Sequence, residues 1–61
     1  MKWYKNWDYK THNYFWWTQR DQRGICFEIR KDNINFNLYV CEEFKSSYVS
    51  LQAAMNAAAI I

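Results

Sequence analysis

The sequence predicts an α+β domain, a three-stranded antiparallel β-meander with one C-terminal helix packed on its apolar face. Three observations lead to this fold class. Residues 25–41 alternate strictly between apolar and polar side chains, as strands with one buried face do. Asp21 and Gly24 occupy the first and fourth positions of a type I turn. Ser50 precedes an alanine-rich stretch in which apolar residues recur at helical spacing.

The chain has 61 residues and is expected to form a single domain: an N-terminal arm at 1–12, the meander at 13–41 and the helix at 50–60. A domain of this size buries only about 60% of its unfolded surface, so it needs additional support. Aromatic residues make up 21% of the chain and include 4 Trp, more than one small core can hide. Surplus Trp and Tyr are typical of interfaces, which predicts a homodimer.

The arm at residues 1–12 is aromatic and basic, without a clear period. Its aromatic residues are Trp3, Tyr4, Trp7 and Tyr9, and its lysines are Lys2, Lys5 and Lys10. Residues 7–9 could belong to a short strand. We expect the arm to pack on its own sheet or on a second subunit, because it is too aromatic for a disordered tail.

The first strand is predicted at residues 13–21. Pairing Asp21 with Ile25 across a three-residue loop places Phe15 and Trp17 on the core face. The opposite face then carries Tyr14, Trp16, Thr18 and Arg20. A change of one residue in the loop would exchange the two sets, since successive side chains of a strand point to opposite faces.

The next two strands are expected to form a hairpin with a two-residue turn at Asp32-Asn33. Its predicted cross-strand pairs are Ile29 with Phe36, Phe27 with Leu38, and Ile25 with Val40. All these apolar residues fall on one face. The strand at 34–41 has low charge and would lie at the edge of a three-stranded sheet, where it would invite pairing with another chain.

Residues 42–49 are expected to connect the hairpin to the helix. Ser50 is a favourable N-cap, and the helix presents a narrow apolar stripe to the sheet. The stripe consists of Leu51, Ala54, Met55 and Ala58. An alternative start near Ser47 would bring Tyr48 onto the same side.

The two cysteines, Cys26 and Cys41, both fall on the polar face of the hairpin. In the predicted register Cys26 faces Tyr39, so the cysteines are diagonal neighbours, roughly 7–8 Å apart and beyond comfortable disulfide reach. We therefore expect free thiols and a reducing compartment. No signal peptide or membrane span is visible, because the longest apolar run covers only residues 57–61. These observations predict a cytoplasmic protein without a membrane partner.

Catalysis is not expected. His12 is the only histidine, and no nucleophile stands beside it at a recognisable spacing. The single glycine, Gly24, rules out a glycine-rich phosphate loop. Two cysteines and one histidine lack the paired spacing of a zinc site. The sequence thus predicts a protein with no enzymatic activity, cofactor or metal.

The exposed sheet face, together with the arm, is the best candidate for a binding surface. Its candidate residues are Trp7, Tyr14, Trp16, Arg20, Arg30, Asn35, Asn37 and Tyr39. Trp, Tyr and Arg dominate the energetics of protein interfaces, and aromatic sheets also stack nucleobases. Packing of this face against a second copy of the chain would also account for its aromatic residues, without any other partner.

The segment that follows the hairpin resembles many short phage and plasmid reading frames. The resemblance lies in the pattern of Phe44, Ser50, Leu51, Ala54 and Ala57, and it covers about residues 14–60. The layout is also similar to the arm-binding domains of tyrosine recombinases, which set their sheet face into the DNA major groove. It therefore implies a small accessory protein of a phage or mobile element.

These observations lead to three functional hypotheses. The first is a non-enzymatic phage-type protein that inhibits a host defence protein through its aromatic surface. The second is a nucleic-acid-binding module that uses the exposed sheet face and the lysines of the arm. The net charge of +2 is compatible with an anionic partner but does not require one. The third is a sponge that sequesters a nucleotide between the aromatic walls of two subunits.

Overall fold

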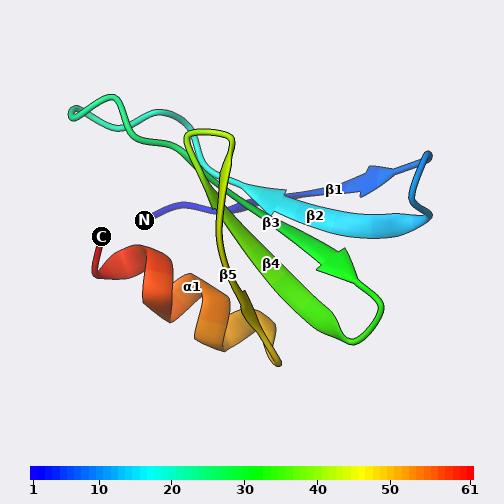
Figure 1. Ribbon diagram of the computed structural model, residues 1–61. Helices are drawn as coiled ribbons and strands as arrows, with labels where there is room; N and C mark the ends of the chain where they lie inside the picture. The colour runs from blue at the N-terminus through cyan, green and yellow to red at the C-terminus, as the bar shows by residue number, and fades with distance from the viewer.

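The computed structural model describes all 61 residues and has two layers, an antiparallel sheet and a helix that covers part of one face (Figure 1). The elements are β1 (Tyr4–Asp8), β2 (Asn13–Trp17), β3 (Phe27–Asp32), β4 (Asn35–Val40), β5 (Glu43–Tyr48) and α1 (Leu51–Ala59). The strands lie side by side in sequence order, so the sheet is a meander. The predicted α+β class is confirmed, but the sheet has five strands rather than three.

The two additional strands come from segments predicted as an arm and as a connection. β1 lies within residues 1–12 and β5 within residues 42–49. Both are edge strands, held by the backbone hydrogen bonds of one neighbour, and their side chains are mostly exposed. Such strands need no strict alternation of apolar and polar residues. The prediction depended on that alternation, and it therefore missed them. The strand predicted as an exposed edge, now β4, lies instead between β3 and β5.

The β3–β4 hairpin has the predicted core face but a different register. Ile29 pairs with Leu38 and Phe27 with Val40, two residues away from the predicted partners. The turn accordingly falls at Asn33-Ile34, and Asn33 adopts a φ of 57°, a left-handed conformation that Asn tolerates better than most residues. An even shift leaves every side chain on its original face.

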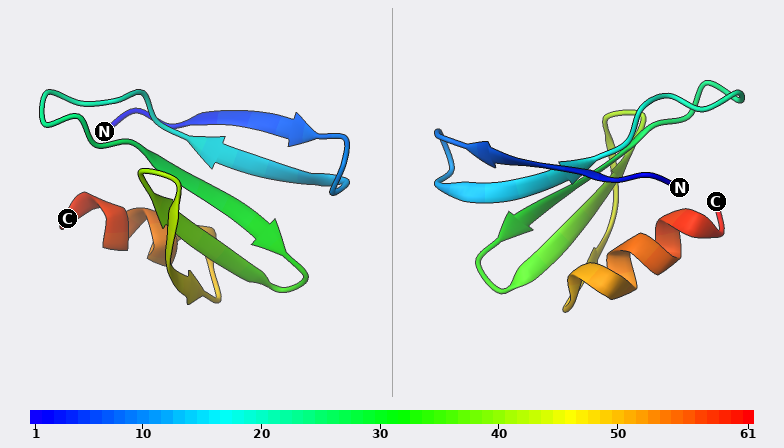
Figure 2. Two further views of the ribbon diagram at one scale, coloured as in Figure 1. Left: turned by 45° about the horizontal axis from the view of Figure 1, so that its top comes forward. Right: turned by 180° about the vertical axis from the view of Figure 1, so that it is seen from behind.

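The core lies between β3, β4 and the helix. Ile29 and Leu38 are 0% exposed, and Ala54 and Ala58 bring the helix backbone close to them. The helix crosses β3, β4 and β5 and leaves β1 and β2 uncovered (Figure 2). Its predicted start is confirmed, because the Ser50 hydroxyl accepts a hydrogen bond of 3.1 Å from the Ala53 amide. Helix α1, with nine residues, is too short to cross a membrane.

A β-bulge separates the β2–β3 loop from the β2–β3 ladder. The loop closes as predicted, since the Asp21 amide donates to the Ile25 carbonyl at 2.9 Å. Further along, however, the Thr18 amide donates to the Phe27 carbonyl at 3.0 Å. Residues 19 and 20, which follow β2, therefore lie opposite the single residue 26, which precedes β3. One extra residue on one strand changes the register by one.

This change inverts the predicted faces of the first strand. Trp16 pairs with Ile29 on the helix side, and its ring centroid lies 5.8 Å from that of Phe36. Phe15 and Trp17 lie on the face away from the helix, so their predicted place in the core is wrong. The strand also ends earlier than predicted, at Trp17, because the bulge interrupts regular pairing.

The cysteines occupy a different geometry from the predicted one. Tyr39 pairs with Glu28 rather than with Cys26, and the Cys41 amide donates to the Cys26 carbonyl at 3.0 Å. The two residues are thus direct rather than diagonal neighbours, and both thiols are free. Cys41 and Glu42 form the two-residue β4–β5 turn with φ values of 50° and 71°.

Candidate binding site on the open sheet face

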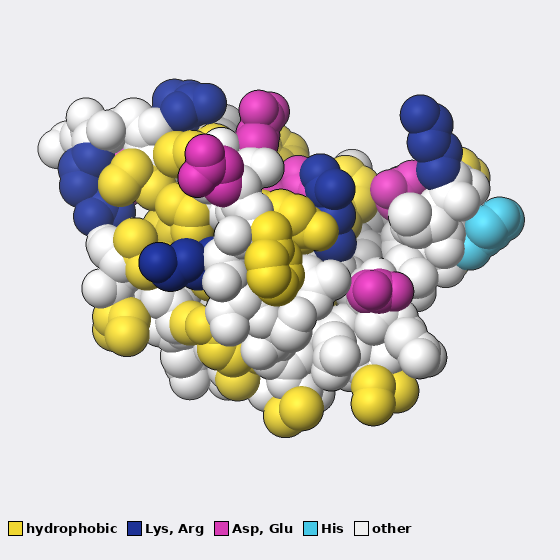
Figure 3. Space-filling view, viewed as in Figure 1, with side chains coloured by type: hydrophobic (Ala, Val, Ile, Leu, Met, Phe, Trp, Pro, Cys, Tyr) yellow, Lys and Arg dark blue, Asp and Glu magenta, His cyan; other side chains and the backbone are white.

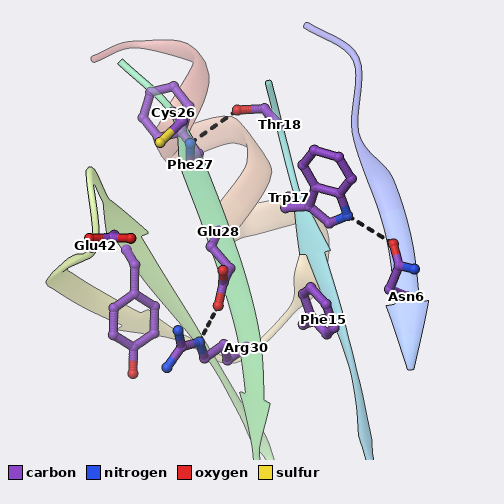
Figure 4. A pocket seen from close by; sticks show the side chains of 10 residues that line it. Asn6, Phe15, Trp17, Thr18, Cys26, Phe27, Glu28, Arg30 and Glu42 are labelled. Carbon is purple, nitrogen blue, oxygen red and sulfur yellow. Dashed lines mark hydrogen bonds and ion pairs between the residues drawn. The ribbon is translucent and has the colours of Figure 1, made fainter. Parts of the chain in front are cut away.

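The face of the sheet away from the helix is uncovered, and we call it the open face. A hollow of about 550 Å³ lies on it, which we call the open-face groove (Figure 4). Its lining includes Asn6, Phe15, Trp17, Glu28, Arg30 and Tyr39. They come from four adjacent strands, β1 to β4, which the meander places side by side.

One wall of the groove is formed by β1 and β2. The ring of Trp17 stacks on that of Tyr4, with centroids 4.7 Å apart. Its indole Nε1 donates a hydrogen bond of 2.8 Å to Oδ1 of Asn6. Stacking and hydrogen bonding together hold the Trp17 ring in one orientation on this side of the groove.

Tyr39 of β4 lines the other side of the groove, and Phe44 of β5 lies next to it, outside the lining. Tyr39 packs edge-on against Phe44, with ring centroids 5.8 Å apart. Phe44 is 59% exposed, so a large apolar side chain projects into solvent beside the groove. An exposed aromatic of this kind is typical of a surface that becomes covered on binding.

An ion pair on β3 lies between these two sides of the groove. The Arg30 guanidinium donates to a carboxylate oxygen of Glu28, and Figure 4 shows the two side chains side by side. This hydrogen bond raises the pKa of Arg30 above its ordinary value. The guanidinium also lies 4.6 Å from the centroid of the Tyr39 ring, in the range of a cation–π contact. Arg30 is therefore held in one orientation by two neighbours.

The charges around the groove nearly cancel. Glu28 neutralises Arg30, and Glu42 adds a further carboxylate at the rim. Uncharged amides continue the surface along β4, where Asn37 Oδ1 accepts a hydrogen bond of 2.6 Å from the Ser47 hydroxyl. The groove combines aromatic rings and amides with little net charge.

The predicted binding residues fall into three places. Arg30, Asn35, Asn37 and Tyr39 lie on the open face, with Asn35 at the β3–β4 turn. Trp7, Tyr14 and Trp16 lie on the helix side of β1 and β2, where Trp7 and Tyr14 pack edge-on at 4.9 Å. Arg20 lies beside the β2–β3 loop and donates to the Gly24 carbonyl at 2.6 Å. The structure therefore does not gather the predicted set on a single face.

Phe15, Trp17, Asn6 and Tyr4 belong to the open face and were not predicted as binding residues. Consecutive aromatic residues at 14–17 place rings on both faces in either register, so the alternation could not choose between them. The β1 residues were missed because no strand was predicted across residues 4–8.

His12, Cys26 and Cys41 do not form one cluster, although the two cysteines are cross-strand neighbours. His12 is in the exposed β1–β2 turn with a φ of 57°, and Figure 3 shows its ring at one extremity of the molecule. Its backbone amide, rather than its ring, contacts Asp8, donating to the carbonyl at 2.9 Å. No three His, Cys, Asp or Glu side chains come together as a metal site would require.

No family model matches this chain, and neither a curated protein nor a solved structure matches it.

Proposed function

We propose that this protein is a non-enzymatic binding protein that attaches to another protein through the open-face groove. The observation that carries the proposal is that two aromatic rings of the groove, Trp17 and Tyr39, lie on either side of the Arg30–Glu28 ion pair. Each ring packs against a neighbouring ring, Trp17 against Tyr4 and Tyr39 against Phe44. Trp, Tyr and Arg in a fixed geometry are the residues from which hot spots of protein interfaces are built. Rings that are already ordered lose little conformational entropy when a partner binds.

The charge of the groove favours a protein over a nucleic acid. Every nucleotide brings a phosphate, and proteins that bind nucleic acid neutralise phosphates with unpaired Lys and Arg. Arg30 is already paired with Glu28, and Glu42 would repel a phosphate at the rim. The same carboxylates disfavour a sequestered nucleotide. The lysines at 5 and 31 lie over rings of the helix-side face, away from the groove. Lys2 lies over the Tyr4 ring, 5.2 Å from its centroid, beside the groove but outside its lining.

We extend this proposal to a blocking role toward a host protein, which is the role that the resemblance to phage and mobile-element proteins implies. A chain of 7.6 kDa that binds through one face acts most directly by covering the surface it binds. The place of action that we propose is the bacterial cytoplasm, a reducing compartment in which the neighbouring thiols of Cys26 and Cys41 stay free.

The test is a pull-down from bacterial lysate with tagged wild type, Tyr39→Ala and Ile34→Lys, each with and without nuclease. Tyr39 belongs to the groove, whereas Ile34 is 74% exposed in the β3–β4 turn and serves as the matched control. We expect wild type and Ile34→Lys to retain one stoichiometric protein after nuclease treatment, and Tyr39→Ala to lose it. Material that disappears with nuclease would overturn the proposal in favour of nucleic acid.

A further inference from the structure

The sheet has two free edges, and they differ in regularity. β1 pairs with β2 over five consecutive residues without interruption. The β4–β5 ladder contains a bulge between Leu38 and Tyr39, and bulges are one of the devices that protect an edge strand from further pairing. β1 therefore presents the regular row of unpaired backbone amides and carbonyls that another strand can join.

The helix-side face of the β1–β2 hairpin is also uncovered, as Figures 1 and 2 show. It carries Lys5, Trp7, Tyr14 and Trp16, which we call the hairpin patch. Trp7 is 40% exposed and Tyr14 is 45% exposed, although the two rings pack against each other. An edge strand bordered by exposed aromatics indicates a surface that a partner covers.

We propose that β1 binds β1 of a second copy of this chain, antiparallel and centred on Asn6, so that the two sheets become continuous. A twofold axis perpendicular to the sheet passes between the two Asn6 residues. This register pairs all five residues of the strand: Tyr4 lies opposite Asp8, Lys5 opposite Trp7, and Asn6 opposite itself. Such an interface is isologous, the arrangement of most homodimers.

The side chains of β1 are complementary to one another in this register. On the helix side, the Lys5 ammonium meets the Trp7 indole of the second copy, a cation–π pair that occurs twice by symmetry. On the open face, the Tyr4 hydroxyl can donate to Asp8, whose Oδ1 already accepts from the Lys10 amide and whose Oδ2 is unused. Two other registers also place residues of the same face opposite each other. Each of them pairs only three residues, and one places Lys5 opposite Lys5 of the second copy.

A lysine on an edge strand often prevents pairing, but Lys5 is not oriented to do so. Its Nζ lies 4.1 Å from the centroid of the Tyr14 ring and 5.9 Å from that of Trp16, both on β2. The ammonium is thus drawn over its own hairpin, away from the free edge. When a second copy binds, the flexible four-carbon stem lets the ammonium turn from Tyr14 to the Trp7 ring of that copy, which lies on the next strand, only about 4.8 Å from β1.

This dimer goes beyond the proposed partner binding. The two share Tyr4 and Asn6 of β1, whereas Lys5 and Trp7 serve the dimer alone and Tyr39 serves the groove alone. The predicted homodimer forms along the strand at 34–41, but that strand lies in the interior of the sheet. The proposal places the contact on β1 instead. The twofold axis leaves both open-face grooves on the same side of the joined sheet. A dimer therefore binds a partner that carries two copies of the recognised surface more tightly than a monomer does.

The first test is the molar mass in solution, measured by sedimentation equilibrium over concentrations up to the millimolar range. Wild type is expected to reach twice 7.6 kDa. Trp7→Lys places like charges opposite each other twice and should raise the dimer dissociation constant by at least about tenfold. The double variant Lys5→Glu/Trp7→Lys restores opposite charges in every pair and should dimerise again. Ile34→Lys, far from β1, is the matched control and should behave as wild type.

A monomer at all concentrations would overturn the proposal, as would a folded Trp7→Lys variant that dimerises like wild type. Isotope-filtered NMR on mixed labelled and unlabelled wild type needs no variant and covers the case in which Trp7→Lys fails to fold. It should show contacts between the Lys5 side chain and the Trp7 ring of different copies. Intermolecular contacts confined to β5 would contradict the β1 interface. Loss of partner binding in Tyr39→Ala with an intact dimer would separate this result from the proposed function.

Discussion

Trp16 lies directly opposite Ile29 in the β2–β3 ladder, and its indole therefore belongs to the helix side of the sheet. Its neighbour Trp17 lies opposite Glu28 and faces the groove. The two tryptophans are adjacent in sequence but have different roles: one packs beside the core, and the other forms part of the candidate site.

Replacing Trp16 with Ala should lower the free energy of unfolding by about 2 kcal/mol, less than for a fully buried tryptophan because the ring is half-buried. Phe15→Ala, on the open face, should lower it by less. Urea denaturation followed by circular dichroism measures both values. If Phe15→Ala were the more destabilising variant, the face assignment of β2 would be inverted.

The parts of the fold that the sequence predicted are those that bury apolar side chains. The alternation in residues 25–41 identified the core face of the hairpin, and Ser50 identified the helix start, because both depend on local patterns. The edge strands β1 and β5 were missed because backbone pairing holds them and leaves little trace in side-chain type.

Only some residues of the candidate site were predicted, because the bulge at residues 19 and 20 inverts the faces of β2. The hairpin pattern places Arg30, Asn37 and Tyr39 on the open face, as the structure does. The predicted register differs from the observed one by two residues, and a shift of two leaves each side chain on its face. Trp17 was placed on the wrong face because one extra residue before the loop inverts β2. The polar segment before Asp21 gave no local signal for that extra residue.

Thr18 supports the bulge, and its removal should be costly. Its Oγ1 accepts a hydrogen bond of 3.0 Å from the Phe27 amide, and the residue is only 7% exposed. Thr18→Val keeps the shape but leaves this amide without its partner, which should cost about 1–3 kcal/mol in unfolding free energy. Thr18→Ser retains the hydroxyl and should recover part of the loss in thermal denaturation. Equal losses for Val and Ser would argue against the hydrogen bond.

Asp21 should make the stability of the β2–β3 loop dependent on pH. The Ile25 amide donates to its carboxylate at 3.0 Å, and together with Arg23 this lowers the pKa of Asp21 below its ordinary value of 3.8. A lowered folded-state pKa means that the stabilisation is complete above the unfolded pKa and is lost as pH falls through the folded pKa. The difference in Tm between wild type and Asp21→Asn should therefore be largest near neutral pH and shrink in acid. A difference that is constant with pH would contradict this role of the charge.

Ile29→Asp should prevent folding. Ile29 is 0% exposed at the centre of the core, and an unpaired buried carboxylate removes several kcal/mol, comparable to the whole stability of a small domain. Circular dichroism should show no cooperative transition. Ile34→Asp, in the exposed β3–β4 turn, is the control and should melt as wild type does.

Site-specific photocrosslinking tests the proposed function most directly. A photoreactive phenylalanine analogue at Tyr39 lies in the groove, and the same analogue at Ile34 lies outside it. In bacterial cells, we expect one discrete protein adduct from position 39, resistant to nuclease, and none from position 34. Adducts from position 34 alone, or a nuclease-sensitive adduct from position 39, would contradict protein binding through the open face.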